Sequence, residues 1–255
     1  FEGTASGTFV IAPAGTATVT LSNLTQTYTG SPLSVTVTTT PPGLAVTVTN
    51  GTQTNAGSYA VTATITDPNY TGSTSGTFVI AKAAATVTLA GLSATYTGAP
   101  QSPAVATVPA GLSFTLTGAP QTNAGSYPVT ATITDANYEG SASGTFVISP
   151  APGATITLGN LTQTYTGSPL QPTVTTTPPG LAVTLTGAPQ TNAGSYPVTA
   201  TIADPNYSGS TSGTFVITKA AATVTLGSLT QMYTGSPLQP VAVTVPAGLT
   251  VALAG

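Results

Sequence analysis

The stretch "SYAVTATITD" at residues 58–67 decides the fold. Every second residue in it is apolar, and threonine fills most of the positions between; the apolar set is Tyr59, Val61, Ala63 and Ile65. This alternation is typical of a β-strand with one buried face. Threonine suits the other face, because its branched Cβ favours extended backbone and its hydroxyl is polar without being charged. Residues 18–21, 35–38 and 46–49 alternate in the same way, so we predict an all-β chain.

The same phrases return along the chain at a fixed spacing. The tyrosines of "YTG" are separated by 68, 69 and 68 residues; they are Tyr28, Tyr96, Tyr165 and Tyr233. The phenylalanines of "SGTFVI" are separated by 69, 68 and 69 residues; they are Phe9, Phe78, Phe146 and Phe215. Two landmarks with one period indicate a tandem array of units. The predicted units are a terminal strand of a preceding repeat at 1–16, three repeats at 17–84, 85–153 and 154–221, and a partial repeat at 222–255.

Turn sequences divide each unit into short strands. In the first repeat they are "TGSP" at 29–32, "TPPG" at 40–43, "TNAG" at 54–57 and "DPNY" at 67–70. Some six short antiparallel strands in about 68 residues predict a small β-sandwich. About four residues separate the last strand of one unit from the first strand of the next in "FVIAKAAATVTL" at 78–89. We therefore expect sandwiches strung end to end in a semi-rigid rod, with contacts between neighbours adding stability.

The composition argues against several classes of function. Charged residues are 3% of the chain, five acidic and two basic, which is too few to neutralise nucleic-acid phosphates. Histidine, cysteine, arginine and tryptophan do not occur, and the five carboxylates are scattered about one to a unit. We predict no catalytic residues, no cofactor and no enzyme activity. No apolar run reaches the ~20 residues of a membrane-spanning helix.

The repeated phrases resemble a known family. They are "Y-T-G-(S/A)-P", then "N-A-G-S-Y-(A/P)-V-T-A-T-I", then "D-(P/A)-N-Y-x-G-S-(A/T)-S-G-T-F-V-I". In this order they resemble the MBG-type bacterial immunoglobulin-like repeats, which occur in tandem in large secreted and cell-surface proteins. The resemblance implies immunoglobulin-like sandwiches serving as a spacer or stalk in adhesin-like proteins, with no family-wide catalytic residues. Two departures are minor: Ala136 replaces the proline of "DPNY", and Phe1 replaces its tyrosine.

Three aspartates are the candidates for a metal site. Asp67, Asp135 and Asp204 each stand two residues before an asparagine. Calcium takes about 6–8 oxygen ligands, usually from several carboxylates, and each unit offers one such aspartate. An aspartate at the start of a turn more often accepts a hydrogen bond from its own backbone, so we predict structural turns rather than a bound ion.

The lysines and tyrosines allow further hypotheses. Lys82 or Lys219 is a candidate for a Lys–Asn or Lys–Asp cross-link, but Pro13 and Pro150 stand at the equivalent junctions, and a solvated linker lysine is the preferred interpretation. Tyrosines on the apolar strand face are predicted to be core residues whose hydroxyls reach a backbone carbonyl; they are Tyr59, Tyr127 and Tyr196. The turn tyrosines are predicted to be the more exposed ones and are candidates for glycan stacking, although packing in the core or at a corner is favoured for them; they are Tyr70, Tyr138 and Tyr207. N-x-S/T triplets make glycan modification chemically feasible at Asn23, Asn50, Asn69, Asn160 and Asn206.

These observations favour a structural function outside the cell. The leading hypothesis is a segment of a long extracellular repeat protein that acts as a stalk or spacer or forms a cell-surface fibre or filament. The expected partners are neighbouring repeats of the same or identical chains, with lateral or end-to-end self-association through edges that lack protective charges. The alternative is an adhesin module that binds glycan or a host protein through exposed turns.

The two ends of the chain fall inside repeats. Phe1 aligns with Tyr207 and Gly255 aligns with Gly187, so 19 residues equivalent to 188–206 would complete the last cycle. This pattern is expected for a window on a longer chain. The alternative is strand exchange, in which 1–16 of one molecule completes 222–255 of the next.

Overall fold

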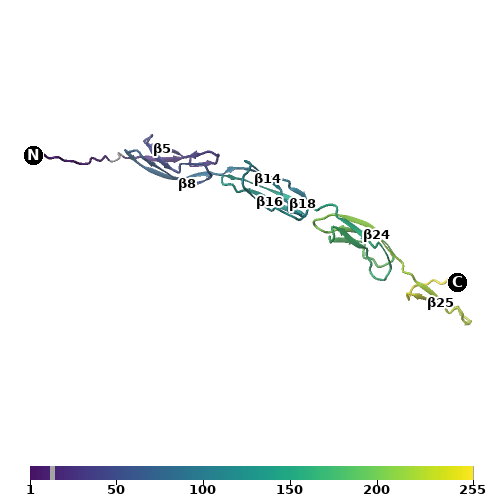
Figure 1. Ribbon diagram of the computed structural model, residues 1–255. Helices are drawn as coiled ribbons and strands as arrows, with labels where there is room; N and C mark the ends of the chain where they lie inside the picture. The colour runs from purple at the N-terminus through teal and green to yellow at the C-terminus, as the bar shows by residue number, and fades with distance from the viewer. Residues whose placement is uncertain (12–14, 255) are drawn as a thin grey trace. The chain divides into compact units, whose positions relative to one another are not determined.

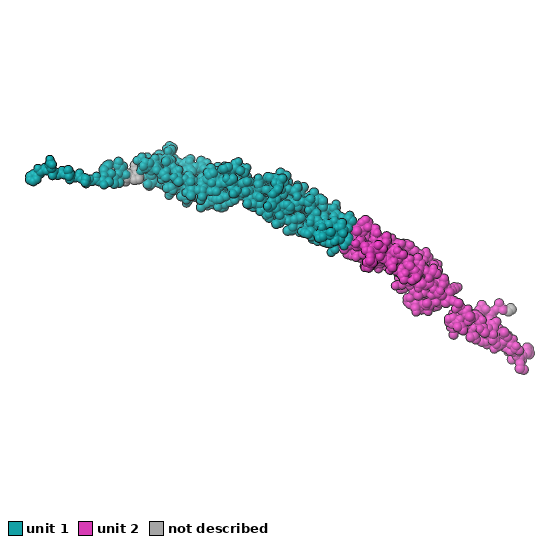
Figure 2. Space-filling view, viewed as in Figure 1, with its two compact units in different colours: residues 1–149 teal, residues 150–255 magenta. Residues whose placement is uncertain are grey.

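The structure is a computed structural model that describes residues 1–11 and 15–254. Pro13 and Gly255, used above in comparing the repeats, lie outside these residues. The chain divides into two compact units, residues 1–149 and 150–255, which Figure 2 shows in two colours. Figure 1 shows two successive sandwiches within unit 1, the first containing β5 and β8 and the second β14, β16 and β18.

The predicted fold class is confirmed. Strands make up about 53% of the chain, and no helix occurs among residues 1–11 and 15–254. Consequently the described part of the chain contains no helix capable of crossing a membrane. The three complete repeats are small β-sandwiches that follow one another in tandem along the sequence.

The first repeat builds its sandwich from a four-stranded and a two-stranded sheet. The strands are β2 (Thr18–Ser22), β3 (Thr25–Thr27), β4 (Leu33–Ser34), β5 (Thr36–Thr40), β6 (Val46–Thr49), β7 (Thr52–Gln53), β8 (Gly57–Ile65), β9 (Tyr70–Thr71) and β10 (Ser73–Ala81). The larger sheet has the order β3-β10-β8-β6, β2 pairs with β5 in the smaller one, and the short strands β4 and β7 pair with each other beside them. A short strand before the repeat, β1 (Gly15–Thr16), pairs with β9.

The second and third repeats have the same arrangement. After the linker strand β11 (Ala83–Ala84), the second comprises β12 (Thr86–Ala90), β13 (Ser93–Thr95), β14 (Ala104–Val108), β15 (Phe114–Thr117), β16 (Gly125–Ile133), β17 (Tyr138–Glu139) and β18 (Ser141–Ser149). The third comprises β19 (Thr155–Gly159), β20 (Thr162–Thr164), β21 (Thr173–Thr177), β22 (Val183–Thr186), β23 (Gly194–Ile202) and β24 (Ser210–Thr218). Their four-stranded sheets have the orders β13-β18-β16-β15 and β20-β24-β23-β22, equivalent to the sheet of the first repeat.

The core of each sandwich comes from the two long strands. In the first repeat Val61, Phe78 and Ile80 are buried to 2% exposure or less, and Leu21 of the smaller sheet packs on them. The alternating burial along β8 matches the alternation of its sequence. Gly76 lies in β10 opposite Val61 of β8, and a Cβ added at this glycine would press on Leu24. A glycine there lets the two sheets approach closely.

One pairing inside each four-stranded sheet differs from the expectation of antiparallel strands. β3 runs parallel to β10, with Val79 opposite Thr25, and β13 and β20 pair in the same way in their repeats. The cause is a sheet switch after β2. The chain turns at Asn23, whose φ of 58° lies in the left-handed region that asparagine tolerates, and then joins the edge of the larger sheet.

The flanking segments are less complete. Of residues 1–16, expected as the terminal strand of a preceding repeat, residues 1–11 are exposed and form no strand, and β1 covers Gly15–Thr16. At the other end β25 (Thr223–Gly227) pairs only with β26 (Val241–Val245). The ribbon leaves Val224 and Val243 more than half exposed.

Candidate functional site at the junction of the first two repeats

The three candidate aspartates each form a turn with the asparagine that follows. The backbone N–H groups of Asn69, Asn137 and Asn206 donate to Oδ1 of Asp67, Asp135 and Asp204 respectively, each at 2.8 Å. This bond is the geometry of an Asx turn, in which the carboxylate holds its own backbone. Among the described residues, no three carboxylate, histidine or cysteine side chains cluster as metal ligands would.

The turn of the second repeat contacts the first repeat. The backbone N–H of Ala56 donates to Oδ1 of Asn137 at 2.8 Å, and Nδ2 of Asn137 donates to Oδ1 of Asn55 at 3.3 Å. Both contacts are between residues about 80 positions apart in the sequence. One asparagine side chain thus satisfies a donor and an acceptor of the neighbouring repeat. We call the region where the turn at 135–140 of the second repeat and the linker 82–85 meet Tyr28, Asn55 and Ala56 of the first repeat the joint.

Aromatic rings extend the joint. Tyr138, which follows Asn137, meets Tyr28 of the first repeat with ring centroids 5.3 Å apart and planes at 80°. Edge-to-face geometry of this kind is favourable for aromatic pairs. The turn at 54–57 of the first repeat is stabilised from within its own repeat, because the Tyr59 hydroxyl donates to the Asn55 carbonyl at 2.8 Å.

The linker between the repeats is itself part of the joint. β11 (Ala83–Ala84) runs parallel to β17 (Tyr138–Glu139), and the Ala85 N–H donates to the Glu139 carbonyl at 2.8 Å. Gly140 follows, and a Cβ at this residue would overlap the Ala85 carbonyl oxygen. The glycine of the "N-Y-x-G" phrase is therefore required for the close approach of the linker.

Lys82 lies in the same linker and forms a hydrogen bond to the second repeat. Its Nζ donates to the main-chain carbonyl of Asp135 at 2.6 Å, while the side chain stays exposed. The ammonium group meets a carbonyl oxygen, which gives a hydrogen bond across the joint rather than a cross-link. The lysine expected to be solvated thus also contacts the turn of the second repeat.

The two groups of tyrosines have different outcomes. The predicted core tyrosines are confirmed: the hydroxyls of Tyr59, Tyr127 and Tyr196 donate to backbone carbonyls at 2.8 to 2.9 Å. The turn tyrosines do not stand out as more exposed, which agrees with the packing in the core or at a corner that is favoured for them. Tyr70, Tyr138 and Tyr207 are all half-buried, and for Tyr138 the reason is its contact with the ring of Tyr28.

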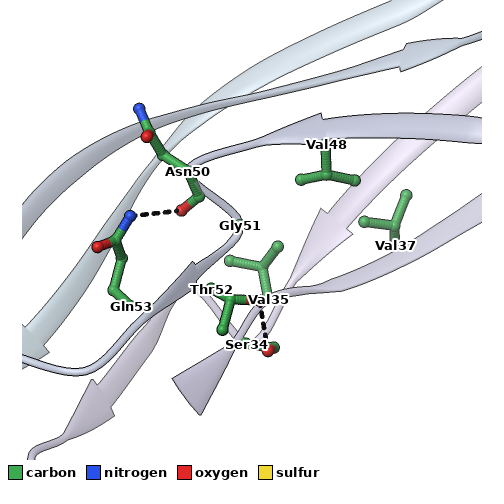
Figure 3. Close-up of a pocket in the computed structure, with 8 residues that line it drawn as sticks. All are labelled: Ser34, Val35, Val37, Val48, Asn50, Gly51, Thr52 and Gln53. Carbon is green, nitrogen blue, oxygen red and sulfur yellow. Dashed lines mark hydrogen bonds between the residues drawn. The ribbon is translucent and has the colours of Figure 1, made fainter. Parts of the chain in front are cut away.

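A hollow beside the turn at 50–53 of the first repeat offers little specific chemistry. It has a volume of about 450 Å³ and lies at the open seam between the sheets, lined by Val35, Val37, Val48 and the turn at 50–53. Figure 3 shows that its polar side chains form hydrogen bonds at this turn. The Gln53 side-chain amide donates to the Asn50 carbonyl, and the hydroxyls of Ser34 and Thr52 bond to each other. The polar groups of this hollow therefore stabilise a turn.

The asparagines of the sequence triplets have structural roles. Asn23, Asn50 and Asn160 have φ values of 53° to 58°, in the left-handed region. The side-chain amide of Asn50 also donates to the Ala60 carbonyl at 3.0 Å. Turn geometry accounts for these three asparagines.

Comparison with protein families identifies the repeats. The family model described as the MBG domain matches residues 17–84, 85–152, 154–221 and 222–254. The chain belongs to the MBG domain family. The joint described above is therefore a junction between two consecutive MBG repeats.

Other comparisons add little to the MBG assignment. No curated protein matches the chain. Among solved structures, it is similar to Sidekick-1 immunoglobulin domains 1-5, with 15% sequence identity and a TM-score of 0.29. The match covers 83% of this chain and 58% of that chain, which is less than two thirds of its length.

The residues of the joint were not recognised from the sequence. The "TNAG" and "DPNY" phrases were interpreted as turns that separate strands within one unit, and no contact between them was expected. The available signal was that both phrases recur at the repeat period. The structure brings the "NAG" phrase of the first repeat against the "D-x-N-Y" phrase of the second.

Proposed function

We propose that this chain is a structural segment of a long extracellular repeat protein, in which MBG sandwiches act as the spacer of a stalk or as the body of a surface fibre. The observation that carries the proposal is the joint between the first two repeats. The polar groups of two recurring phrases meet across the repeat boundary, where Asn137 binds Ala56 and Asn55. A repeat protein gains length from repeat number only when successive units hold a defined relation.

Three further observations support this function. The family to which the chain belongs is typical of surface proteins. Each long pair of strands, such as β8 and β10, is joined over eight residue pairs, a ladder that resists tension along the strands. The aspartates are used by turns, which is consistent with our inference that the chain is not an enzyme.

The adhesin alternative has weaker support. It requires accessible rings on the turns, whereas Tyr138 packs against Tyr28 and the other two turn tyrosines are half-buried. A glycan array with the intact chain tests it. Binding that disappears in a variant carrying Tyr70→Ala, Tyr138→Ala and Tyr207→Ala would favour the adhesin function over the spacer.

The spacer function is tested by pulling single molecules from both ends. Each complete repeat of about 68 residues is expected to unfold in one event that converts it into an extended segment of about 220–240 Å, and the lengthening is this value less the end-to-end span of the folded repeat. A chain that extends smoothly without discrete events would contradict a load-bearing function. Location is tested separately by treating intact source cells with protease: a surface stalk is expected to be cut while cytoplasmic proteins are spared.

A further inference from the structure

The C-terminal end of the third repeat carries the same residue types as the half of the joint that the first repeat supplies. We call this surface the acceptor face. It consists of Tyr165, Asn192, Ala193 and the linker 219–222, at the positions of Tyr28, Asn55, Ala56 and the linker 82–85. The turn is also held in the same way, since the Tyr196 hydroxyl donates to the Asn192 carbonyl at 2.9 Å, as Tyr59 donates to Asn55.

The acceptor face is open where its counterpart in the first repeat is covered. Tyr165 is 41% exposed and Ala193 is exposed, whereas Tyr28 and Ala56 are half-buried beneath the turn of the second repeat. A hollow of about 410 Å³ lies over the face, and Pro246 and Leu249 complete its wall. Unit 2 therefore has a preformed cavity built from the residues that hold a turn in unit 1.

The groups on the acceptor face specify what fits it. The backbone N–H of Ala193 needs an acceptor, the Asn192 side chain offers an amide oxygen, and the Tyr165 ring offers an aromatic surface. In unit 1 the equivalent groups are met by one asparagine amide and the ring of the next residue, Asn137 and Tyr138. A carboxylate in place of the amide would supply the acceptor but no donor. An Asn-Tyr pair supplies both, and the preceding Asx turn fixes its shape.

We propose that the acceptor face is a binding site for the D-x-N-Y turn of a further MBG repeat. The asparagine of that turn accepts from the Ala193 N–H and donates to Asn192, and its tyrosine ring packs edge-on against Tyr165. The site is modular, because the ligand is a turn that every complete repeat of this chain carries. The proposal uses the joint geometry on which the proposed function rests, but its test measures only the third repeat.

The test extends the 255-residue chain with a copy of residues 188–221, which completes the fourth repeat and supplies its D-P-N-Y turn. Amide hydrogen exchange of Ala193 is compared with that of Ala56 in the same molecule. The Ala193 exchange is expected to slow at least about tenfold relative to the 255-residue chain, the change expected for one or two net hydrogen bonds. The matched control carries Asn206→Ala in the appended copy only, and it is expected to return Ala193 to fast exchange.

Two results would overturn the proposal. One is a folded fourth repeat, shown by slow exchange at the appended copy of Phe215, with Ala193 still as fast as before. The other is equal protection of Ala193 in the extended chain and in its Asn206→Ala control. If Ala56 is also unprotected in every sample, the joint and the proposed function fail together; fast exchange at Ala193 alone refutes only this proposal.

A second measurement does not depend on folding of the appended segment. The 255-residue chain is titrated with the peptide TDANYEG, residues 134–140, and followed by NMR. Shifts centred on Ala193 and Tyr165, which are lost with a TDAAYEG peptide, are expected. Absence of saturable shifts at millimolar peptide contradicts the proposal, as does a larger response at the same residues to a soluble oligosaccharide, which would make the face a glycan site.

Discussion

Changing Asn137 to alanine should loosen the joint between the first two repeats while leaving both sandwiches folded. The substitution removes the acceptor of the 2.8 Å bond from Ala56 and the donor of the 3.3 Å bond to Asn55. The turn itself should persist, because it uses the backbone N–H of residue 137 and the carboxylate of Asp135. The variant thus separates the contact from the fold.

The size of the effect follows from the two bonds. A typical hydrogen bond contributes about 0.5–1.5 kcal/mol net, and the 3.3 Å bond belongs at the low end of that range. We expect a loss of about 1–2 kcal/mol of joint stability, equivalent to a roughly 5- to 30-fold increase in opening. Asn137→Asp keeps the acceptor and loses the donor, so it should cost about half as much.

Native-state amide hydrogen exchange at Ala56 measures this effect directly. Its rate should rise by the stated factor in Asn137→Ala, while Val61 and Val129 in the two cores keep their protection. The matched control is Asn69→Ala, which changes the equivalent, exposed asparagine of the first repeat. An unchanged Ala56 rate, or an equal rise in the control, would refute the assignment of the joint to Asn137.

Three further predictions concern the same elements. Phe146→Ala should lower the stability of the second repeat by about 3–5 kcal/mol in chemical denaturation, because Phe146 is 1% exposed, whereas Phe9→Ala in the same phrase should have no measurable effect, because Phe9 is 88% exposed. Tyr138→Ala should remove about 0.5–1.5 kcal/mol of ring contact with Tyr28 beyond the lost burial, and so raise the Ala56 exchange rate. Tyr138→Phe keeps the ring and should behave like wild type, so equal effects of the two substitutions would contradict the ring contact. Gly140→Ala should disrupt the pairing of β11 with β17, because its Cβ overlaps the Ala85 carbonyl, and the Ala85 amide should then exchange faster. Gly7→Ala, where the added atom meets nothing, should leave this exchange unchanged. An unaffected Ala85 amide in Gly140→Ala would refute the steric argument.

The strands and the core could be predicted because both follow from local alternation. Phe78, Phe146 and Phe215 are apolar residues at period-two positions, and they are buried as that position requires. The parallel pairing of β3 with β10 could not be predicted in this way. It arises from a sheet switch between distant strands, and alternation reports which face a residue occupies but not which strand lies beside it.

The prolines inside the long strands show a related limit. Because proline donates no backbone hydrogen bond, a proline such as Pro128 belongs at the start of a strand or on an edge. It lies within β16 and pairs with Thr145 of β18 on one side. On the other side, the pairing of β15 with β16 stops at Thr130 and does not reach Pro128. The strand is locally an edge at Pro128, which depends on the length of a neighbour that the sequence of β16 does not contain.

The joint could not be predicted because its contacts are far apart in the chain. Asn137 looks like any turn asparagine in its own segment, and Ala56 carries no distinctive side chain. Their contact depends on how the linker at 82–85 places one repeat against the next. The repeat period indicated that the phrases matter to every unit, and the structure shows what those of the first and second repeats contact.

The central claim is that the D-x-N-Y turn fixes one MBG repeat against its predecessor, and a distance distribution tests it most directly. The chain contains no cysteine, so spin labels at Thr62→Cys in β8 and Thr132→Cys in β16 would be the only ones present, both at exposed positions. We expect a single narrow distance distribution in the otherwise unchanged chain and a broad one when Asn137→Ala and Gly140→Ala are added. A distribution that is already broad before these changes, or one that stays narrow after them, would contradict the account.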